Sequence, residues 1–91
     1  MDIAAANPIA FVLGDAPRGF RGTIQRLEVL EGGSSLSAIE LESQLIEMGF
    51  VEGARVEILH EGAIRRDPIA VRVNNITIAL RRREAMAVVV A

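Results

Sequence analysis

The sequence predicts a small, mainly β domain with one α-helix. Several short segments alternate apolar and polar residues, as half-buried strands do, and one central segment carries the start and stop signals of a helix. The chain has 91 residues, of which 51% are hydrophobic and only three are aromatic, and it has no cysteine. The core must therefore come from aliphatic burial, without disulfides. We expect residues 1–91 to form a single domain.

The N-terminal segment, residues 1–16, is mostly small and apolar and runs into the turn-like sequence Gly14-Asp15-Ala16-Pro17. It is expected either to fray or to pack on the domain, whose core we place at about residues 17–91. The segment lacks a basic region, Asn7-Pro8 interrupts its apolar run, and it is too short to span a bilayer. The sequence therefore predicts a cytoplasmic protein that reaches a membrane only through a partner.

The first strand is predicted at about residues 21–30. Its expected core residues are Ile24, Leu27 and Val29. Ile24 and Leu27 are three positions apart, so they cannot share one face of a regular strand. This change of phase predicts a β-bulge, which would curve the strand. Glycine and serine dominate residues 31–35, where we expect a flexible loop.

A helix is predicted to follow this loop. Ser37 and Glu40 have the spacing of a capping box, and Leu36 with Leu41 has the spacing of a hydrophobic staple. Gly49 tolerates left-handed φ just past the helix end. One face of the helix is apolar and consists of Ala38, Leu41, Leu45 and Met48. The helix is therefore expected to have about three turns and to cover the core of the β domain.

The second half of the chain alternates apolar and polar residues in four further segments. We predict strands at about residues 54–60, 69–73, 76–80 and 87–90. Asn74-Asn75 tolerates positive φ and suits a hairpin turn. Residues 61–68 are expected to form a loop, because Pro68 cannot donate to a strand ladder. Residues 82–85 are expected to form a single helical turn.

The composition argues against nucleic-acid binding. The net charge is −2, every basic side chain other than His60 is arginine, and the chain has neither tryptophan nor tyrosine. A nucleic-acid binder needs a basic surplus and aromatic stacking platforms, and this chain has neither. The glycines also match no phosphate-binding spacing, so nucleotide hydrolysis is not expected.

His60 is the only imidazole in the chain and is a weak candidate metal ligand. A metal site would need two or three further ligands, and only Glu61 and Asp67 offer carboxylates nearby. A surface histidine at a strand end is the simpler interpretation. Without cysteine, a single histidine cannot be matched to a nucleophile from the sequence alone. We therefore predict no metal site, no cofactor and no enzymatic activity.

Two clusters of arginine are the candidate partner-binding residues. They consist of Arg65, Arg66, Arg81, Arg82 and Arg83. One interpretation is a solvated charged surface, which the twelve acidic residues of the chain balance. The other is a docking edge, because arginine forks bind carboxylates bidentately and are enriched at interfaces. The sequence leaves both interpretations open.

Four segments of the second half together resemble the ferrous-iron transport protein A (FeoA) family. Met48-Gly49-Phe50 is similar to the family's helix end, and Glu52-Gly53-Ala54-Arg55-Val56 is similar to the x-x-Gly-x-x-Val pattern that follows it. Asp67-Pro68 is similar to the end of the family's loop. Residues 78–85 match an Ile-Ala-Leu-Arg-Arg-x-Glu-Ala segment. The order and spacing of the four segments are more specific than any one of them.

This resemblance implies a small SH3-like, partly open β-barrel that is capped by a helix. It also implies a non-enzymatic cytoplasmic accessory or regulatory module of bacterial ferrous-iron uptake, which docks on the FeoB-type membrane permease that carries a GTP-binding domain. A fold does not fix a role, so two alternatives stay open. They are a domain associated with an iron-dependent transcriptional repressor and a protein that binds ferrous ion directly. The exposed strand edges of such a barrel would also permit homo-oligomers.

Overall fold

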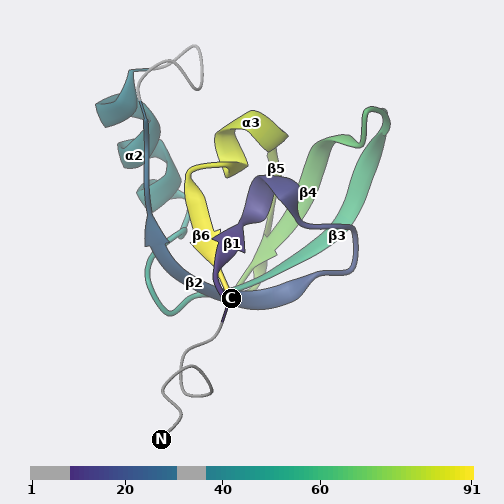
Figure 1. Ribbon diagram of the computed structural model, residues 1–91, viewed down its shortest axis with the longest axis horizontal. Coiled ribbons are helices and arrows are strands. Elements are labelled where there is room, and N and C mark those ends of the chain that lie inside the picture. The colour runs from purple at the N-terminus through teal and green to yellow at the C-terminus, as the bar shows by residue number, and fades with distance from the viewer. Residues whose placement is uncertain (1–8, 31–36) are drawn as a thin grey trace, which may run out of the picture.

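The computed structural model describes residues 9–30 and 37–91, which form one curved sheet and one main helix (Figure 1). The strands of this part of the chain are antiparallel and follow the order β1-β6-β2-β3-β4-β5. The elements are β1 (Phe11–Val12), the 3-10 turn η1 (Leu13–Asp15), β2 (Arg21–Leu27), α2 (Ala38–Glu47), β3 (Arg55–Ile64), β4 (Asp67–Val73), β5 (Ile76–Leu80), α3 (Arg82–Ala85) and β6 (Val88–Val90). None of the helices in these residues has the length and apolar character that a membrane crossing needs.

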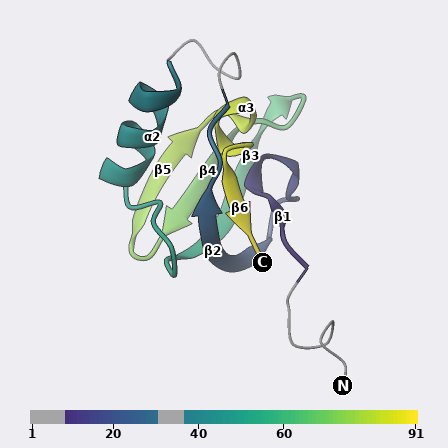
Figure 2. The same ribbon diagram turned by 60° about the vertical axis from the view of Figure 1, so that its left-hand side comes forward.

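Strand β2 belongs to both halves of the sheet and makes the sheet curve. Its first residues pair with β3, with Arg21 opposite Glu57, and its last residues pair with β6. The register shifts between Ile24 and Arg26, which confirms the predicted bulge. β1 and β5 form the two edges of the described sheet, so the barrel is partly open (Figure 2).

The inner face of the curved sheet and one face of α2 enclose an aliphatic core. Its fully buried side chains include Leu13, Ile24, Leu45, Phe50, Ile58, Val71, Val88 and Val90. All three residues of β6 are buried, and Val88 and Val90 belong to the core. Burial of each large aliphatic side chain contributes about 1.5–3 kcal/mol, so the core is the main source of stability.

Residues 11–16 pack against the core rather than fraying. β1 pairs with β6, and Leu13 and Ala16 are 0% and 1% exposed. The ring of Phe11 meets the ring of Phe20 edge to face, with 5.1 Å between their centroids. The core therefore begins by residue 11, which is earlier than the boundary that the sequence suggests.

The β3–β4 hairpin is longer than predicted, and the loop predicted over residues 61–68 is wrong. β3 and β4 continue through most of this segment, and only Arg65 and Arg66 form the turn. Both residues have positive φ, at 58° and 59°. Pro68 lies in β4 where the register between the two strands shifts, so its missing N–H interrupts no regular ladder.

The other boundaries agree closely with the sequence pattern. β2 ends at Leu27 rather than at residue 30, and β6 begins at Val88 rather than at residue 87. Asn74 has a φ of 54°, which confirms the predicted turn between β4 and β5, and α3 is the predicted helical turn. Two predictions lie outside the described residues: the contact of Leu36 and the loop over residues 31–35.

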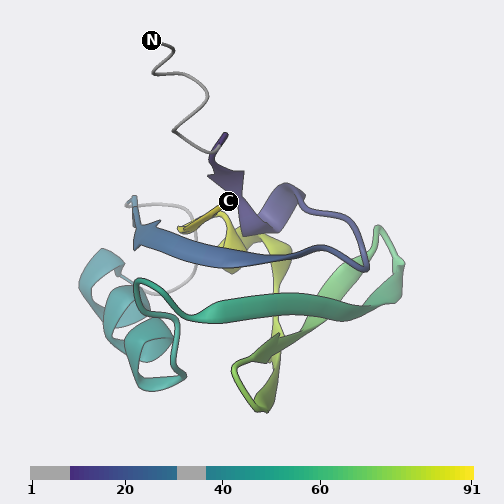
Figure 3. The ribbon, with the colours of Figure 1, turned by 90° about the horizontal axis from the view of Figure 1, so that it is seen from below.

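The capping box predicted for α2 is present. The backbone N–H of Glu40 donates to Ser37 Oγ at 3.2 Å, and the backbone N–H of Ser37 donates to Glu40 Oε1 at 3.1 Å. Leu41 and Leu45 are buried against the barrel, and Gly49, with a φ of 100°, follows the helix end as predicted. Figure 3 shows α2 at one end of the β2–β3 pair and the β3–β4 turn at the other.

Replacing Ser37 by alanine should lower the free energy of unfolding by about 1 kcal/mol, because its hydroxyl satisfies an N–H of the first turn that has no partner within the helix. Urea denaturation of the Ser37→Ala variant measures this loss. A variant as stable as the wild type would show that the capping box does not stabilise the folded state.

The same capping box makes the stability depend on pH. Hydrogen bonds from the backbone and side chain of Ser37 lower the pKa of Glu40 below its ordinary value of 4.5. The contribution of this carboxylate is therefore present above that value and is lost as the pH falls through the lowered pKa. The difference in stability between the wild type and Glu40→Gln should be larger at about pH 7 than at about pH 3. An equal difference at both values would contradict the linkage.

Candidate functional site

The structure brings the two predicted arginine clusters together at one corner of the barrel. The backbone N–H of Arg82 donates to Asp67 Oδ1 at 2.8 Å, and Arg82 Nε donates to the carbonyl oxygen of Arg66 at 2.7 Å. The start of α3 therefore lies against the β3–β4 turn. We call the five residues there the arginine corner: Arg65, Arg66, Arg81, Arg82 and Arg83.

Arg82 is the internal anchor of the arginine corner. Its Nη1 donates to the carbonyl oxygens of Gly14 at 3.1 Å and Ala16 at 2.8 Å, and its Nη2 donates to Glu61 Oε1 at 2.9 Å. The side chain of Arg82 is only 17% exposed. Together with the bond to Arg66, one guanidinium joins the N-terminal turn, β3 and the β3–β4 turn. Arg82 thus points into the protein, although its position in the sequence looks the same as that of its neighbours.

Gly14 lets η1 approach α3 closely enough for this network. A Cβ at position 14 would lie 2.5 Å from the carbonyl oxygen of Arg82 and 2.6 Å from Sδ of Met86. Both distances are shorter than real carbon contacts, so a larger residue would push η1 away from α3. The carbonyl groups that Arg82 binds would move with it.

The other four arginines of the corner are exposed. Within residues 9–30 and 37–91, their guanidinium groups make no hydrogen bond or ion pair. The hydrogen bonds of Arg81 come from its backbone: its N–H donates to Glu84 Oε1 at 3.2 Å, and its carbonyl oxygen accepts from the N–H groups of Glu84 and Ala85. A guanidinium carries five N–H donors in a planar fork that fits a carboxylate. The corner therefore presents several such forks to solvent.

The β3–β4 turn is strained at the two arginines that it exposes. Positive φ at both central residues is typical of a type I′ turn, in which Asn-Gly is favoured. A left-handed backbone costs a non-glycine residue about 1–2 kcal/mol. Arg65 and Arg66 adopt this backbone without the residue types that would relieve it. Backbone strain at exposed residues motivates a hypothesis of function.

His60 lies exposed on β3. No group of three or more His, Cys, Asp or Glu in this part of the chain could hold an ion. The two nearby carboxylates have other partners: Glu61 Oε1 accepts from Arg82 Nη2, and Asp67 Oδ1 accepts from the backbone N–H of Arg82. They hold the arginine corner together instead of serving His60.

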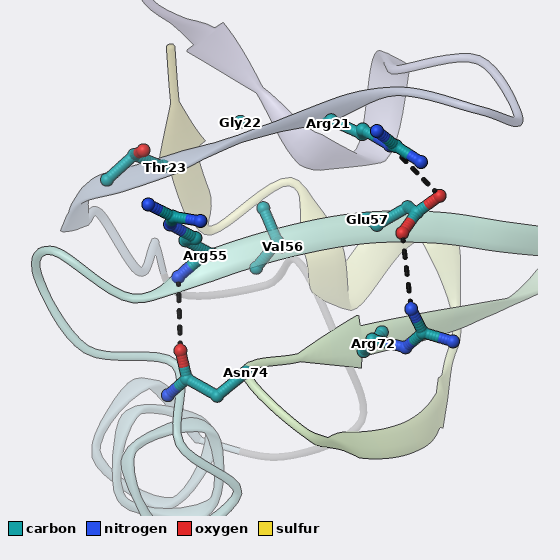
Figure 4. A pocket seen from close by; sticks show the side chains of 8 residues that line it. All are labelled: Arg21, Gly22, Thr23, Arg55, Val56, Glu57, Arg72 and Asn74. Atoms are coloured by element: carbon teal, nitrogen blue, oxygen red, sulfur yellow. Dashed lines mark hydrogen bonds and ion pairs between the residues drawn. The ribbon is translucent and has the colours of Figure 1, made fainter.

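A second polar feature, which the sequence pattern does not reveal, is an open hollow of about 590 Å³ on the outer face of β2, β3 and β4 (Figure 4). It is lined by Arg21, Gly22, Thr23, Arg55, Val56, Glu57, Arg72 and Asn74. Strand alternation does predict that Arg55, Glu57 and Arg72 face outward. It does not predict which strands are neighbours. Only the pairing of β2, β3 and β4 brings Arg21, Arg55 and Arg72 together.

The partly open barrel and the helix that covers it define a small SH3-like β-barrel domain. Residues 11–91 match the FeoA domain family, and the chain belongs to this family. The resemblance, the mainly β fold that the sequence predicts and the SH3-like barrel that the resemblance implies are thus confirmed. No curated protein matches the chain.

Solved structures of FeoA proteins and of a repressor are similar to this chain. FeoA of Stenotrophomonas maltophilia, solved with zinc, is 27% identical, and the match covers 89% of each chain with a TM-score of 0.72. Iron(II) transport protein A of Clostridium thermocellum is 34% identical, and the match covers 89% of this chain and 45% of that one with a TM-score of 0.71. A manganese-dependent transcriptional repressor is 21% identical, and the match covers 93% of this chain and 42% of that one with a TM-score of 0.72. At that identity, the repressor shows a shared fold alone.

Proposed function

We propose that this chain is a non-enzymatic accessory or regulatory module of bacterial ferrous-iron uptake. In this proposal it acts in the cytoplasm, at the inner face of the membrane, by docking on a FeoB-type permease that carries a GTP-binding domain. Membership of the FeoA family supports the link to iron transport. The Stenotrophomonas maltophilia relative is described as a possible bacterial ferrous-iron transport activating factor, and we extend a role of that kind to this chain.

The observation that carries the docking proposal is the exposed, strained turn of the arginine corner. Arg65 and Arg66 hold unfavourable backbone angles while their forks face solvent, beside Arg81 and Arg83. Arg82 fixes the turn through the carbonyl oxygen of Arg66. A fixed turn loses little conformational freedom when a partner binds, which favours affinity. Carboxylates on the partner are the groups that this corner fits best.

The alternatives have less support. The repressor shares the fold with this chain, but 21% identity carries no function. Direct binding of ferrous ion would need a ligand cluster, and the described residues contain none. Catalysis would need an acid, base or nucleophile in a defined arrangement, and the only imidazole, His60, is exposed on a strand. Membership of the FeoA family therefore favours an accessory role over these alternatives.

The double variant Arg65→Asn/Arg66→Gly separates docking from folding. It keeps a type I′ turn and the carbonyl bond to Arg82, so the free energy of unfolding should be unchanged or rise by about 1 kcal/mol. It also removes two forks from the corner. Recovery of the permease from gently solubilised native membranes, with the tagged chain as bait and mass spectrometry as readout, should therefore fall about tenfold.

Arg26→Gln is the matched control for this experiment. Arg26 is an exposed arginine of β2 outside the corner, and it pairs only with Glu28 among the described residues. This variant should recover the permease as well as the wild type does. Undiminished recovery by the double variant would overturn the role of the corner. A wild-type chain that recovers no permease would overturn the proposed function itself.

A further inference from the structure

The open hollow of β2, β3 and β4 is separate from the arginine corner, because it contains none of the corner's five residues. Its centre is a ladder of charges across three strands. Glu57 lies directly opposite Arg21 on β2 and directly opposite Arg72 on β4. Arg21 Nε donates to Glu57 Oε2 at 3.2 Å, and Arg72 Nη1 lies 3.6 Å from Glu57 Oε1. One carboxylate thus holds two guanidinium groups in place.

Arg55 adds a third cation that this carboxylate does not neutralise. In Figure 4 it lies with Thr23 and Asn74 on the side of the hollow away from the Arg21–Glu57 pair. Its backbone N–H donates to Asn74 Oδ1 at 3.4 Å, but its guanidinium has no hydrogen bond or ion pair with the described residues. The hollow therefore has two more positive than negative side chains, although the whole chain has a net charge of −2.

Most N–H donors of the guanidinium groups in the hollow are not engaged by Glu57. The side chains of Arg21 and Arg72 are 79% and 51% exposed, and each makes a single contact with Glu57. Ion pairs at such exposure contribute little to folding stability. Each guanidinium carries five N–H donors, so most of them face solvent. The ladder positions the arginines without using up their capacity to bind an anion.

The spacing of the three arginines fits an extended chain better than a single small anion. Side chains on one face of a strand repeat about every 7 Å, and two strand spacings span about 10 Å. Arg21 and Arg72 lie on either side of Glu57, two strand spacings apart, and Arg55 lies two residues along β3 from Glu57, so the three arginines form a triangle with sides of about 8–10 Å. Carboxylates at alternate residues of an extended segment are about 7 Å apart, so long arginine side chains can pair with two or three of them, whereas one small anion cannot reach all three arginines. We propose that this hollow binds an acidic, extended segment of a partner protein. The proposal does not depend on the identity of the permease.

Fluorescence anisotropy with a labelled peptide tests this proposal on the full chain. The probe is a peptide in which glutamate alternates with alanine, and its control is the same peptide with glutamine in place of glutamate. The wild type should bind the acidic peptide and not the control, and the affinity should fall with added salt. Arg55→Ala and Arg72→Ala should each weaken binding about fivefold or more, because each removes one carboxylate partner.

Two further variants make the test specific. Arg26→Ala removes an exposed arginine outside both the hollow and the arginine corner, so it should bind the peptide as the wild type does. Glu57→Gln removes the negative charge that competes with the peptide and keeps an amide oxygen that can still accept from Arg21, so it should bind more tightly, whereas simple damage to the surface would weaken binding. Wild-type affinity in Arg55→Ala and Arg72→Ala would overturn the proposal, and so would weaker binding by Glu57→Gln. Preferential displacement of the peptide by inorganic phosphate would assign the hollow to a small anion instead. A failed permease pull-down would leave these results unaffected.

Discussion

Replacing Arg82 by methionine should lower the free energy of unfolding by about 3 kcal/mol. Methionine keeps the long apolar stem but removes every N–H donor. The carbonyl oxygens of Gly14, Ala16 and Arg66 would lose their partner, and Glu61 would keep a partly buried charge. An unsatisfied buried acceptor costs about 1–3 kcal/mol, and unpairing a buried ion costs about 3–5 kcal/mol. The side chains of Arg82 and Glu61 are 17% and 25% exposed, so water reduces the sum.

Arg83→Met is the matched control for this prediction, because it makes the same change one residue later on an exposed side chain. Its free energy of unfolding should stay within about 0.5 kcal/mol of the wild type. Urea denaturation of both variants measures the difference. Equal stability of the two would show that the network around Arg82 does not stabilise the fold. If Arg82→Met is less stable than Arg83→Met, weaker partner binding by an Arg82 variant would reflect its lower stability. Variants of the exposed arginines are then the ones that can identify the docking surface.

The elements that the sequence predicts well are those whose signals lie within a few neighbouring residues. Ser37 and Glu40 form a capping box whatever the rest of the chain does, and the structure contains both of its hydrogen bonds. The change of phase between Ile24 and Leu27 needs only the alternation of one strand, and the register shift appears there. Asn74 tolerates positive φ by its own chemistry. Local physics is sufficient in each case.

The β3–β4 turn could not be predicted in the same way, because its conformation depends on a distant residue. Arg65 and Arg66 carry no local preference for left-handed φ. The hydrogen bond from Arg82 to the carbonyl oxygen of Arg66 joins residues 16 positions apart and holds the turn in place. Pro68 also suggested a loop, but it lies at a register shift where a strand tolerates it. Tertiary contacts override local propensity at this position.

In the candidate site, too, the sequence reveals what depends on neighbouring residues but not what depends on contacts with distant ones. The arginine clusters are visible in the sequence, but nothing local distinguishes the inward Arg82 from the outward Arg81 and Arg83. The difference lies in carbonyl groups of Gly14 and Ala16, which are 68 and 66 positions away. Sequence reasoning can therefore find such clusters of charge, while the division into anchor and exposed surface requires the fold.

Replacing Leu45 by alanine should also lower the free energy of unfolding by about 3 kcal/mol, and it should release α2 before the sheet. The helix has ten residues, fewer than the about 12–15 that an isolated helix needs to be even marginally stable in water. Its stability must therefore come from packing, and Leu41 and Leu45 are its buried residues. Leu45 is 0% exposed, and truncation of a buried leucine to alanine costs about 2–5 kcal/mol.

Ile46→Ala is the matched control, because it removes a side chain of the same size one position along, where 48% is exposed. It should lower the free energy of unfolding by no more than about 1 kcal/mol. Hydrogen exchange then locates the effect of Leu45→Ala: amides of α2 should exchange faster than amides of β3 and β4, because the helix can open while the paired strands stay closed. Equal losses in the two variants would mean that the Leu41–Leu45 face does not hold the helix. Equal acceleration in α2, β3 and β4 would mean that Leu45 belongs to one cooperative core, and that the helix cannot leave the barrel without unfolding it.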